Sequence, residues 1–179
     1  MSIRIVGGFL GGRMLTTLPG RQTRPATERV REAVFSILQH DIEGTQVLDL
    51  FAGSGAYAIE AVSRGAVGAV MIEKDQRAAA IIKQNLRTFG LDLRLIIADW
   101  KKGLEILAGE GEKFNLVFAD PPYGTVTSEK IDEELKKNDL IAPGGFFIME
   151  HAGDMASELP HLIKMRRFGD SAISIFAYE

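Results

Sequence analysis

Residues 45–65, TQVLDLFAGSGAYAIEAVSRG, set the fold of this 179-residue chain. The apolar run from Val47 to Leu50 predicts a buried strand, and the residues from Ala56 to Arg64 predict a helix. Gly53 and Gly55 allow the tight turn between them. Strand, glycine turn and helix in this order are typical of a nucleotide-binding unit, although the pattern is a weak signal when it stands alone.

The same alternation continues to the end of the chain. Ala69 to Ile72 is a second predicted strand, which ends in Glu73, an acid placed to bind ribose hydroxyls. Further helices are expected over residues 76–88, up to residue 107 and over 129–137, and further strands at 93–98, 114–119, 146–149, 163–167 and 172–178, with a turn at 143–145. This order predicts an α/β fold with a mostly parallel sheet, an antiparallel edge and helices on both faces.

Acidic side chains stand where four consecutive predicted strands end. They are Asp49, Glu73, Asp99 and Asp120. Ligands of such sheets bind outside the carboxyl ends of the strands, so these residues are expected to share one site. The pyrophosphate of a dinucleotide is repelled by so many carboxylates, whereas the sulfonium of S-adenosylmethionine is compatible with them. In this interpretation the glycine turn approaches the methionine part, Glu73 binds the ribose and Asp99 binds the adenine amine.

The segment FNLVFADPPYG, residues 114–124, predicts how an acceptor amine is held. Its apolar run ends in Asp120, and Pro121 and Pro122 then exclude both helix and strand, so the chain leaves the sheet as a stiff loop. The Asp120 carboxylate and the Pro121 carbonyl are acceptors, and Tyr123 adds a flat ring. This set suits a nucleobase with an exocyclic NH2 group, held by the acceptors and stacked on the tyrosine. A rigid turn that merely ends a strand is the plainer alternative.

Positive charge gathers at the N-terminus of a chain whose net charge is −3. Residues 1–32 hold six arginines against two glutamates, and the remainder is acidic. Such an arm points to a polyanion bound at one end, although a solvated arm without a partner has the same composition. Strands at 4–6 and 14–18 are expected to form a β-hairpin with a flexible, glycine-rich connection, followed by a helix that Thr27 caps and that runs to His40.

Length and composition favour one domain over residues 1–179, with a basic extension at 1–40 and a core at 41–179. The absence of cysteine excludes disulfides and thiol chemistry and fits a reducing compartment. The N-terminus lacks a secretion signal, and no apolar run approaches the roughly 20 residues that span a bilayer. The three histidines lie apart, without the spacing of metal ligands. We therefore expect a cytoplasmic monomer that uses neither a membrane nor a metal.

Several motifs together resemble a known family. DLFAGSG, the acid at Glu73, Asp99 and DPPY occur in the order of amino-methyltransferases. IVGGFLGGR, TRPATERVREAVFSIL and FGDSAISIF resemble the bacterial 16S rRNA guanine-N2 methyltransferases of the RsmD type, so the resemblance covers nearly the whole chain. It implies a Rossmann-like, seven-stranded sheet and direct methyl transfer from S-adenosylmethionine to a guanine N2 of 16S rRNA, free or in the assembling small subunit. Ala26 and Tyr57 depart from the family pattern.

The strand ends and the resemblance together define the expected site. The catalytic residues are Asp120, Pro121 and Tyr123; the cofactor residues are Asp49, Phe51, Gly53, Gly55, Glu73, Lys74, Asp99 and Trp100; and the substrate contacts are Arg4, Arg13, Arg24, Thr27, Arg31 and Pro122. Trp100 or a neighbouring apolar residue is expected to cover the adenine ring.

Two other functions are compatible with the same motifs. An N6-adenine DNA methyltransferase uses the same acceptor loop, but the chain between Gly55 and Asp120 has room for only two strands with their helices and none for a target-recognition insert. Specificity would then come from the arginine-rich arm, which suits a folded RNA better than a DNA sequence. A catalytically silent RNA-binding module that has kept the fold is the second alternative.

Overall fold

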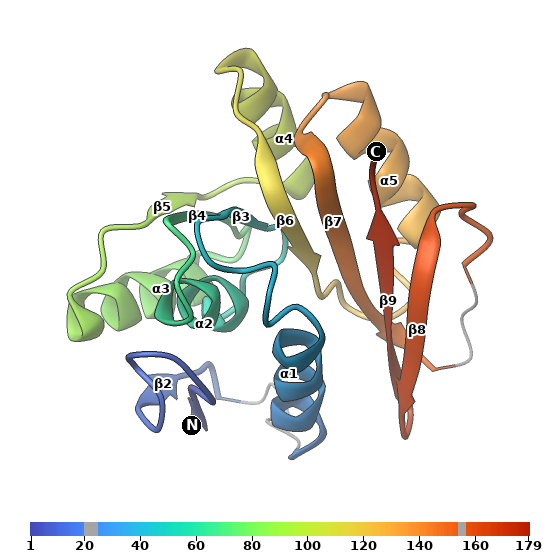
Figure 1. Cartoon of the computed structure of the whole chain (residues 1–179). Coiled ribbons are helices and arrows are strands. Elements are labelled where there is room, and N and C mark those ends of the chain that lie inside the picture. Colours follow the sequence, from blue (N-terminus) through green and yellow to red (C-terminus); the bar gives the residue numbers. More distant parts are fainter. Residues whose placement is uncertain (20–24, 154–156) are drawn as a thin grey trace.

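The computed structural model describes residues 1–19, 25–153 and 157–179, except for the side chains of residues 25–27. The elements follow one another from a short hairpin at the N-terminus to an antiparallel strand pair at the C-terminus (Figure 1). They are β1 (Ser2–Arg4), β2 (Met14–Thr16), α1 (Pro25–Ile37), β3 (Gln46–Asp49), α2 (Ala56–Ser63), β4 (Gly68–Ile72), α3 (Gln76–Phe89), β5 (Arg94–Ile96), α4 (Trp100–Gly109), β6 (Phe114–Ala119), α5 (Ser128–Lys137), β7 (Ile141–Ala152), β8 (Leu162–Phe168) and β9 (Ser171–Ala177).

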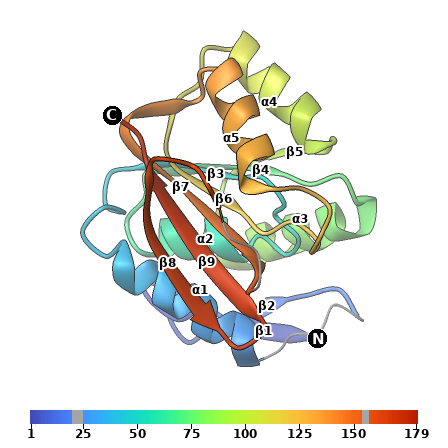
Figure 2. The ribbon, with the colours of Figure 1, turned by 90° about the vertical axis from the view of Figure 1, so that its right-hand side faces the viewer.

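Within the described residues, one sheet of seven strands has the order β5-β4-β3-β6-β7-β9-β8. The neighbours from β5 to β7 pair in parallel, and β9 pairs antiparallel with both β7 and β8. Figure 2 looks onto the β8 edge of this sheet. The expected Rossmann-like α/β fold is confirmed, with the antiparallel strand β9 one position inside the edge strand β8.

Alternating side chains of the central strands supply two separate apolar cores. Leu116 and Phe118 of β6 pack into the cluster that also contains α1, α2 and α3, whereas Val117 and Ala119 pack toward α4 and α5. The two helix layers lie on opposite faces of the sheet (Figure 1). This period of two explains why β6 is apolar at every residue except Asn115, since both of its faces are covered. In the described part of the chain, no helix combines the length and apolarity needed to cross a membrane.

The turn predicted at residues 143–145 is wrong, because these residues lie inside β7. The pairing register shifts there, from Phe114 opposite Ile141 to Leu116 opposite Phe146. The N–H of Gly144 donates to the Tyr178 carbonyl at 3.0 Å, and the N–H of Tyr178 donates to the Gly145 carbonyl at 2.9 Å. The segment is therefore a bulge whose backbone groups remain paired, rather than a break in the strand.

The predicted N-terminal hairpin is confirmed, but its glycine-rich connection is fixed to α2 rather than flexible. The Phe9 N–H donates to the Ser63 carbonyl at 2.8 Å, the Leu10 N–H donates to Ser63 Oγ at 2.9 Å, and Ser63 Oγ donates to the Gly7 carbonyl at 2.6 Å. Gly8 makes this contact possible, because its φ is +74° and a Cβ there would lie 1.8 Å from the Ser63 carbonyl oxygen.

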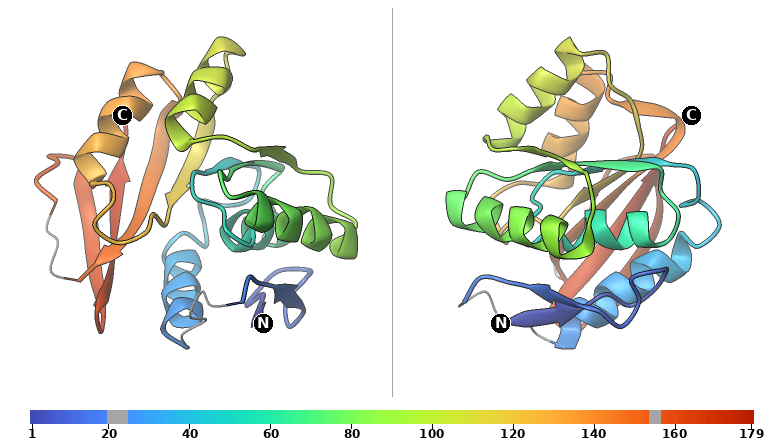
Figure 3. Two further views of the ribbon diagram at one scale, coloured as in Figure 1. Left: turned by 180° about the vertical axis from the view of Figure 1, so that it is seen from behind. Right: turned by 90° about the vertical axis from the view of Figure 1, so that its left-hand side faces the viewer.

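The helix after the hairpin starts earlier than predicted. α1 begins at Pro25 rather than after Thr27, since the fixed φ of proline suits the first turn of a helix and its missing N–H costs nothing there. The hairpin and α1 lie on the same side of the sheet as α2 and α3 (Figure 3).

Candidate active site

A cavity of about 360 Å³ opens at the carboxyl ends of β3, β6 and β7. Its wall combines the glycine turn 51–54, the start of α2, the loop 120–123 and Glu150 of β7. The N-terminal extension closes one side through Ile3 and residues 17–18, and Arg31 of α1 contributes to the same wall. The segment that the sequence singled out as a nucleotide-binding turn and the one predicted to hold an amine therefore meet in one space.

The DPPY loop follows β6 directly and lies outside helix and strand, as its prolines predict. Pro121 is buried, whereas Pro122 and Tyr123 are exposed and face the cavity. The Pro122 carbonyl accepts the N–H of Thr125 at 3.1 Å and its hydroxyl at 2.6 Å, which closes a turn behind the loop. The Tyr123 hydroxyl forms a hydrogen bond with the Ser171 hydroxyl at the start of β9. The ring is thereby anchored at its far end, and half of its surface remains exposed.

Three carboxylates extend from the sheet on the face that α1, α2 and α3 cover. Asp49, Asp120 and Glu150 each lie two residues after a side chain of that core, namely Val47, Phe118 and Ile148. Because side chains alternate along a strand, all three project to this face. The grouping of these acids follows from the period of the strands and not from local sequence.

Burial and mutual repulsion perturb the acids of this group. Burial, with smaller contributions from the charges of Asp120 and Glu73, raises the pKa of Asp49 to about 7. One carboxylate oxygen of Asp49 is buried without a hydrogen-bond partner among the described residues. Burial and the charge of Asp120 raise the pKa of Glu150 to about 8. These shifts arise chiefly from burial, and a cationic ligand beside the carboxyl groups would favour their ionised forms.

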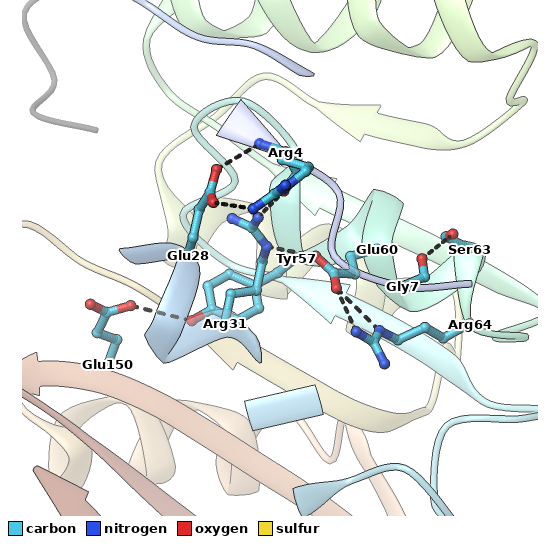
Figure 4. A network of polar contacts seen from close by, with 9 residues as sticks. All are labelled: Arg4, Gly7, Glu28, Arg31, Tyr57, Glu60, Ser63, Arg64 and Glu150. Atoms are coloured by element: carbon cyan, nitrogen blue, oxygen red, sulfur yellow. Dashed lines mark hydrogen bonds and ion pairs between the residues drawn. The ribbon is translucent and has the colours of Figure 1, made fainter. Parts of the chain in front are cut away.

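Two residues that were not expected in the site, Tyr57 and Glu150, form a pair in the cavity wall. The Tyr57 hydroxyl donates to Glu150 Oε2 at 3.2 Å (Figure 4). Its ring stacks on Phe118 with centroids 5.0 Å apart. The sequence does contain a signal for Glu150. Like the other acids of the site, it directly follows a predicted strand, here the one at 146–149. Tyr57 departs from the family pattern, but its position in a helix is also typical of a core residue.

The glycine turn is held by the acid that the sequence placed beside it. Glu73 accepts the Gly53 N–H through Oε2 and the Asp75 N–H through Oε1, each at 2.8 Å. Gly55 has φ +81°, and a Cβ there would lie 3.2 Å from the sulfur of Met71, so a larger residue would be strained and crowded. Asn85 of α3 donates to the Ser54 carbonyl at 2.9 Å and thus fixes the turn from the other side.

An aromatic pair stands beside this turn. Phe51 and Trp100 are half-buried, with ring centroids 6.0 Å apart and planes inclined by 46°. Asp99 is exposed and caps α4 by accepting the Lys101 N–H at 3.1 Å, and Lys74 is exposed next to Glu73. Among the residues that the structure describes, Phe51 and Gly53 line the cavity, whereas Glu73, Asp99 and Trp100 lie beside it along the same edge.

The arginines of the extension have different surroundings. Arg31 is buried, and its Nε donates to the fully buried Glu60 of α2 at 2.6 Å, while its Nη2 donates to the Arg4 carbonyl (Figure 4). Glu60 also pairs with Arg64 at 2.8 Å. Arg31 therefore joins the hairpin, α1 and α2, which its sequence context did not indicate.

The other expected substrate contacts are either exposed at the surface or lie outside the residues that the structure describes. Arg4 is exposed; its backbone N–H donates to Glu28 Oε1 at 2.8 Å, and its Nη2 lies 3.8 Å from Glu28 Oε2. The exposed Arg13 stacks over the Phe89 ring, with its guanidinium carbon 4.6 Å from the ring centroid. Arg24 and the side chain of Thr27 lie outside the described residues.

Comparison with known proteins assigns the chain to a family. Residues 3–177 match a family described as conserved hypothetical protein 95. Ribosomal RNA small subunit methyltransferase D of Escherichia coli (strain K12) is 36% identical over 148 residues, which cover 83% of this chain and 74% of that protein. A hypothetical protein of Thermus thermophilus superimposes with a TM-score of 0.85 at 32% identity, covering 97% of this chain and 98% of its own.

A more distant structure shares the fold alone. The 16S rRNA N2-guanine methyltransferase RsmC of Thermus thermophilus, in complex with AdoMet and guanosine, has a TM-score of 0.75 at 19% identity and covers 100% of this chain and 50% of its own. The family match covers residues 3–177, and the identity to the Escherichia coli protein is 36%. The chain belongs to the ribosomal RNA small subunit methyltransferase D family.

Proposed function

We propose that this protein transfers a methyl group from S-adenosylmethionine to the exocyclic N2 amine of a guanine in small-subunit ribosomal RNA. The observation that carries the proposal is the meeting of the DPPY loop and the glycine turn in one cavity at the carboxyl edge of the sheet. One wall offers acceptors for an amine, and the adjoining turn offers a place for a nucleoside cofactor.

The charges of the site fit a cationic cofactor. The buried Asp49 oxygen without a described partner and the raised pKa values of Asp49 and Glu150 mark carboxyl groups whose ionised forms a cation would stabilise, and the nearby cation Arg31 is already paired with Glu60. A phosphate-bearing ligand would repel these ionised forms. S-adenosylmethionine, when bound, supplies an electrophilic methyl group on a positively charged sulfur, and it carries no phosphate.

The expected cofactor residues have separate tasks in this proposal. Asp49, Gly53 and Gly55 surround the methionine part, and Glu73 with Lys74 lies at the ribose. Asp99 accepts the adenine amine, and the inclined pair of Phe51 and Trp100 encloses the adenine ring.

The acceptor loop acts by position and electrostatics. Asp120 and the Pro121 carbonyl accept the two N–H groups of the guanine amine, while Pro122 and Tyr123 pack against the base. Drawing these hydrogens toward acceptors localises the nitrogen lone pair, which is otherwise conjugated with the ring. An amine that gains a methyl group must lose a proton, and the Asp120 carboxylate, which accepts one of its N–H groups in this proposal, can take it. Such positioning can lower a barrier by about 7–11 kcal/mol without a covalent intermediate.

RNA is the polyanion that the extension would bind. Relatives in this family are named as methyltransferases of small-subunit ribosomal RNA, and the more distant RsmC structure, which has the same fold, holds AdoMet and guanosine. Arg4, Arg13, Arg24 and Thr27 are the proposed contacts to phosphates, and Arg31 holds the hairpin and α1 against the core. We expect the protein to act as a cytoplasmic monomer, with residues 1–40 and 41–179 working as one domain.

The proposal is tested by methyl transfer from radiolabelled S-adenosylmethionine to three acceptors in parallel: small-subunit particles, naked small-subunit rRNA and duplex DNA. Nucleoside analysis of the product should show N2-methylguanosine from RNA or particles. N6-methyladenine from DNA would keep the reaction class and overturn the substrate, and no label in any acceptor would favour a silent binding module.

A further inference from the structure

Holding an exocyclic amine does not by itself select guanine. Adenine and cytosine also carry exocyclic amines, and the acceptors of the DPPY loop can bind any of them. Guanine differs in its neighbouring ring position, because N1 carries a hydrogen, whereas the corresponding ring nitrogen of adenine is an acceptor. An acceptor next to Asp120 would therefore distinguish guanine from adenine.

The register of the sheet places one such acceptor beside Asp120. β6 and β7 are parallel neighbours, and Ala119 lies opposite Met149. The next residues are Asp120, which follows β6 directly, and Glu150 of β7, and paired strands are spaced about 5 Å apart. Both side chains project to the face covered by α2, and both line the 360 Å³ cavity.

The Glu150 side chain is held in this position by its surroundings. Only 5% of the residue is exposed, yet it contributes to the cavity wall. The Tyr57 hydroxyl donates to its Oε2, and the Tyr57 ring is packed between Phe35 and Phe118 at centroid distances of 6.1 and 5.0 Å. Arg31, the cation of the same wall, forms its 2.6 Å ion pair with Glu60.

We infer that Glu150 accepts the N1–H of the target base and thereby selects guanine. This inference rests on the proposed function. Asp120 and the Pro121 carbonyl hold the N2 amine, and Glu150 recognises the adjacent ring nitrogen. An adenine in the same orientation would direct a lone pair at the carboxylate, which leaves a buried charge without a donor from the base.

Because the free carboxyl group keeps its proton up to about pH 8, acceptance of an N1–H requires that the base itself favour the ionised form. Burial and the charge of Asp120 raise the pKa of Glu150 to about 8, and the Tyr57 hydroxyl and the charge of Arg31 only partly oppose them. The protein itself therefore does little to stabilise the ionised carboxylate. The N1–H of guanine would supply a further donor and would favour the ionised form.

The test compares guanine with 2-aminopurine at the methylated position of otherwise identical small-subunit rRNA. 2-Aminopurine keeps the exocyclic amine at C2, but its N1 is an acceptor. The wild-type enzyme is expected to prefer guanine by about 100-fold or more in kcat/KM, as sites built around a substrate N–H do. In Glu150→Gln the side-chain amide can donate to N1, so the preference should fall to about 10-fold or less. 2-Aminopurine also lacks the O6 atom of guanine, but both enzymes meet this same difference. The change in the kcat/KM ratio between wild type and variant therefore reports on Glu150.

A second variant distinguishes recognition of the base by Glu150 from structural support of the Glu150 side chain. Tyr57→Phe removes the hydroxyl that donates to Glu150 and keeps both the carboxyl group of Glu150 and the ring at residue 57. Its preference for guanine should therefore remain near the wild-type value even if its rate falls.

Three results would contradict the inference. The first is methylation of 2-aminopurine by the wild-type enzyme as efficiently as guanine, which needs no variant to establish. The second is an equal fall in kcat/KM for guanine and for 2-aminopurine in Glu150→Gln, which would show that the role of Glu150 is purely structural. The third is a loss of preference in Tyr57→Phe as complete as that in Glu150→Gln. Failure of the wild-type enzyme to methylate guanine itself would instead overturn the proposed function.

Discussion

Burial of Asp49 next to other carboxylates makes the stability of this protein depend on pH. The folded pKa of Asp49 is about 7, against an ordinary value of 3.8, chiefly because of burial. Between these two values the folded state keeps a proton that the unfolded state has released. The contribution of this proton to the free energy of unfolding is therefore greatest at the acid end of this pH range and is lost as the pH rises to about 7.

Asp49→Asn tests this effect, because an asparagine stays neutral at every pH. Near pH 4 the variant and the wild type should have similar free energies of unfolding. Near pH 8 the variant should gain on the order of a few kcal/mol relative to the wild type, which must then bury a charge. Urea unfolding at both pH values, without cofactor, measures the change. An offset that is the same at both pH values would show that Asp49 does not titrate in this window.

At the scale of elements, the N-terminal hairpin depends on a close approach to α2. Gly8 allows the 2.8 Å hydrogen bond between the Phe9 N–H and the Ser63 carbonyl, because any Cβ at residue 8 would overlap that carbonyl. Gly12 provides a matched position in the same loop. Its φ of +84° is similar, but a Cβ there would have no described atom within 4 Å beyond its chain neighbours.

We expect Gly8→Ala to detach the hairpin and Gly12→Ala to retain it. Gly12→Ala should cost only the backbone strain, about 1–3 kcal/mol, whereas Gly8→Ala should also lose the hydrogen bonds to Ser63. Amide hydrogen exchange of Phe9 and Leu10 should therefore become fast in Gly8→Ala and remain slow in Gly12→Ala. Equal protection in the two variants would contradict the docking of the hairpin on α2.

Elements with a strong local signal are predictable from the sequence, and those set by tertiary contacts are not. The predicted strand at 114–119 has the observed bounds of β6, Phe114–Ala119, because it is apolar on both faces and ends at Asp120. The bulge in β7 resembles a turn in sequence, since glycine and proline favour a turn locally, but its pairing with Tyr178 and with β6 on both sides of the bulge keeps the strand continuous. The fixed position of the glycine-rich loop likewise depends on Ser63, which lies 56 residues beyond Gly7 in the chain.

The same distinction applies to the site. Strand ends reveal Asp49, Glu73 and Asp120, because the carboxyl edge of a parallel sheet is predictable from the order of strands. The pairing of Arg31 with Glu60 and the contact of Tyr57 with Glu150 join helices and strands that are far apart in sequence. No local pattern specifies such contacts.

At the scale of the whole molecule, the arginine-rich extension lies at one end of an otherwise acidic protein. If Arg13 contacts a phosphate, its neutral variant Arg13→Gln should reduce the slope of log affinity against log salt by about 0.7, the value for one phosphate of single-stranded RNA. Filter binding to small-subunit rRNA over a range of salt concentrations measures the slope. Arg94→Gln is the control, because Arg94 pairs with Glu110 on the surface near β5. An unchanged slope in Arg13→Gln would remove this arginine from the RNA interface.

The central claim is that the DPPY loop holds the amine while other residues hold the cofactor, and the Asp120→Ala variant tests it most directly. Single-turnover methyl transfer to small-subunit rRNA and titration of S-adenosylmethionine should be measured on the same preparation. We predict that transfer falls by at least about 100-fold, because an acceptor for the N2 hydrogens is lost, while cofactor affinity stays within about 10-fold of the wild type. Transfer at the wild-type rate, or loss of cofactor binding in parallel with loss of transfer, would contradict the assignment of Asp120 to the acceptor amine.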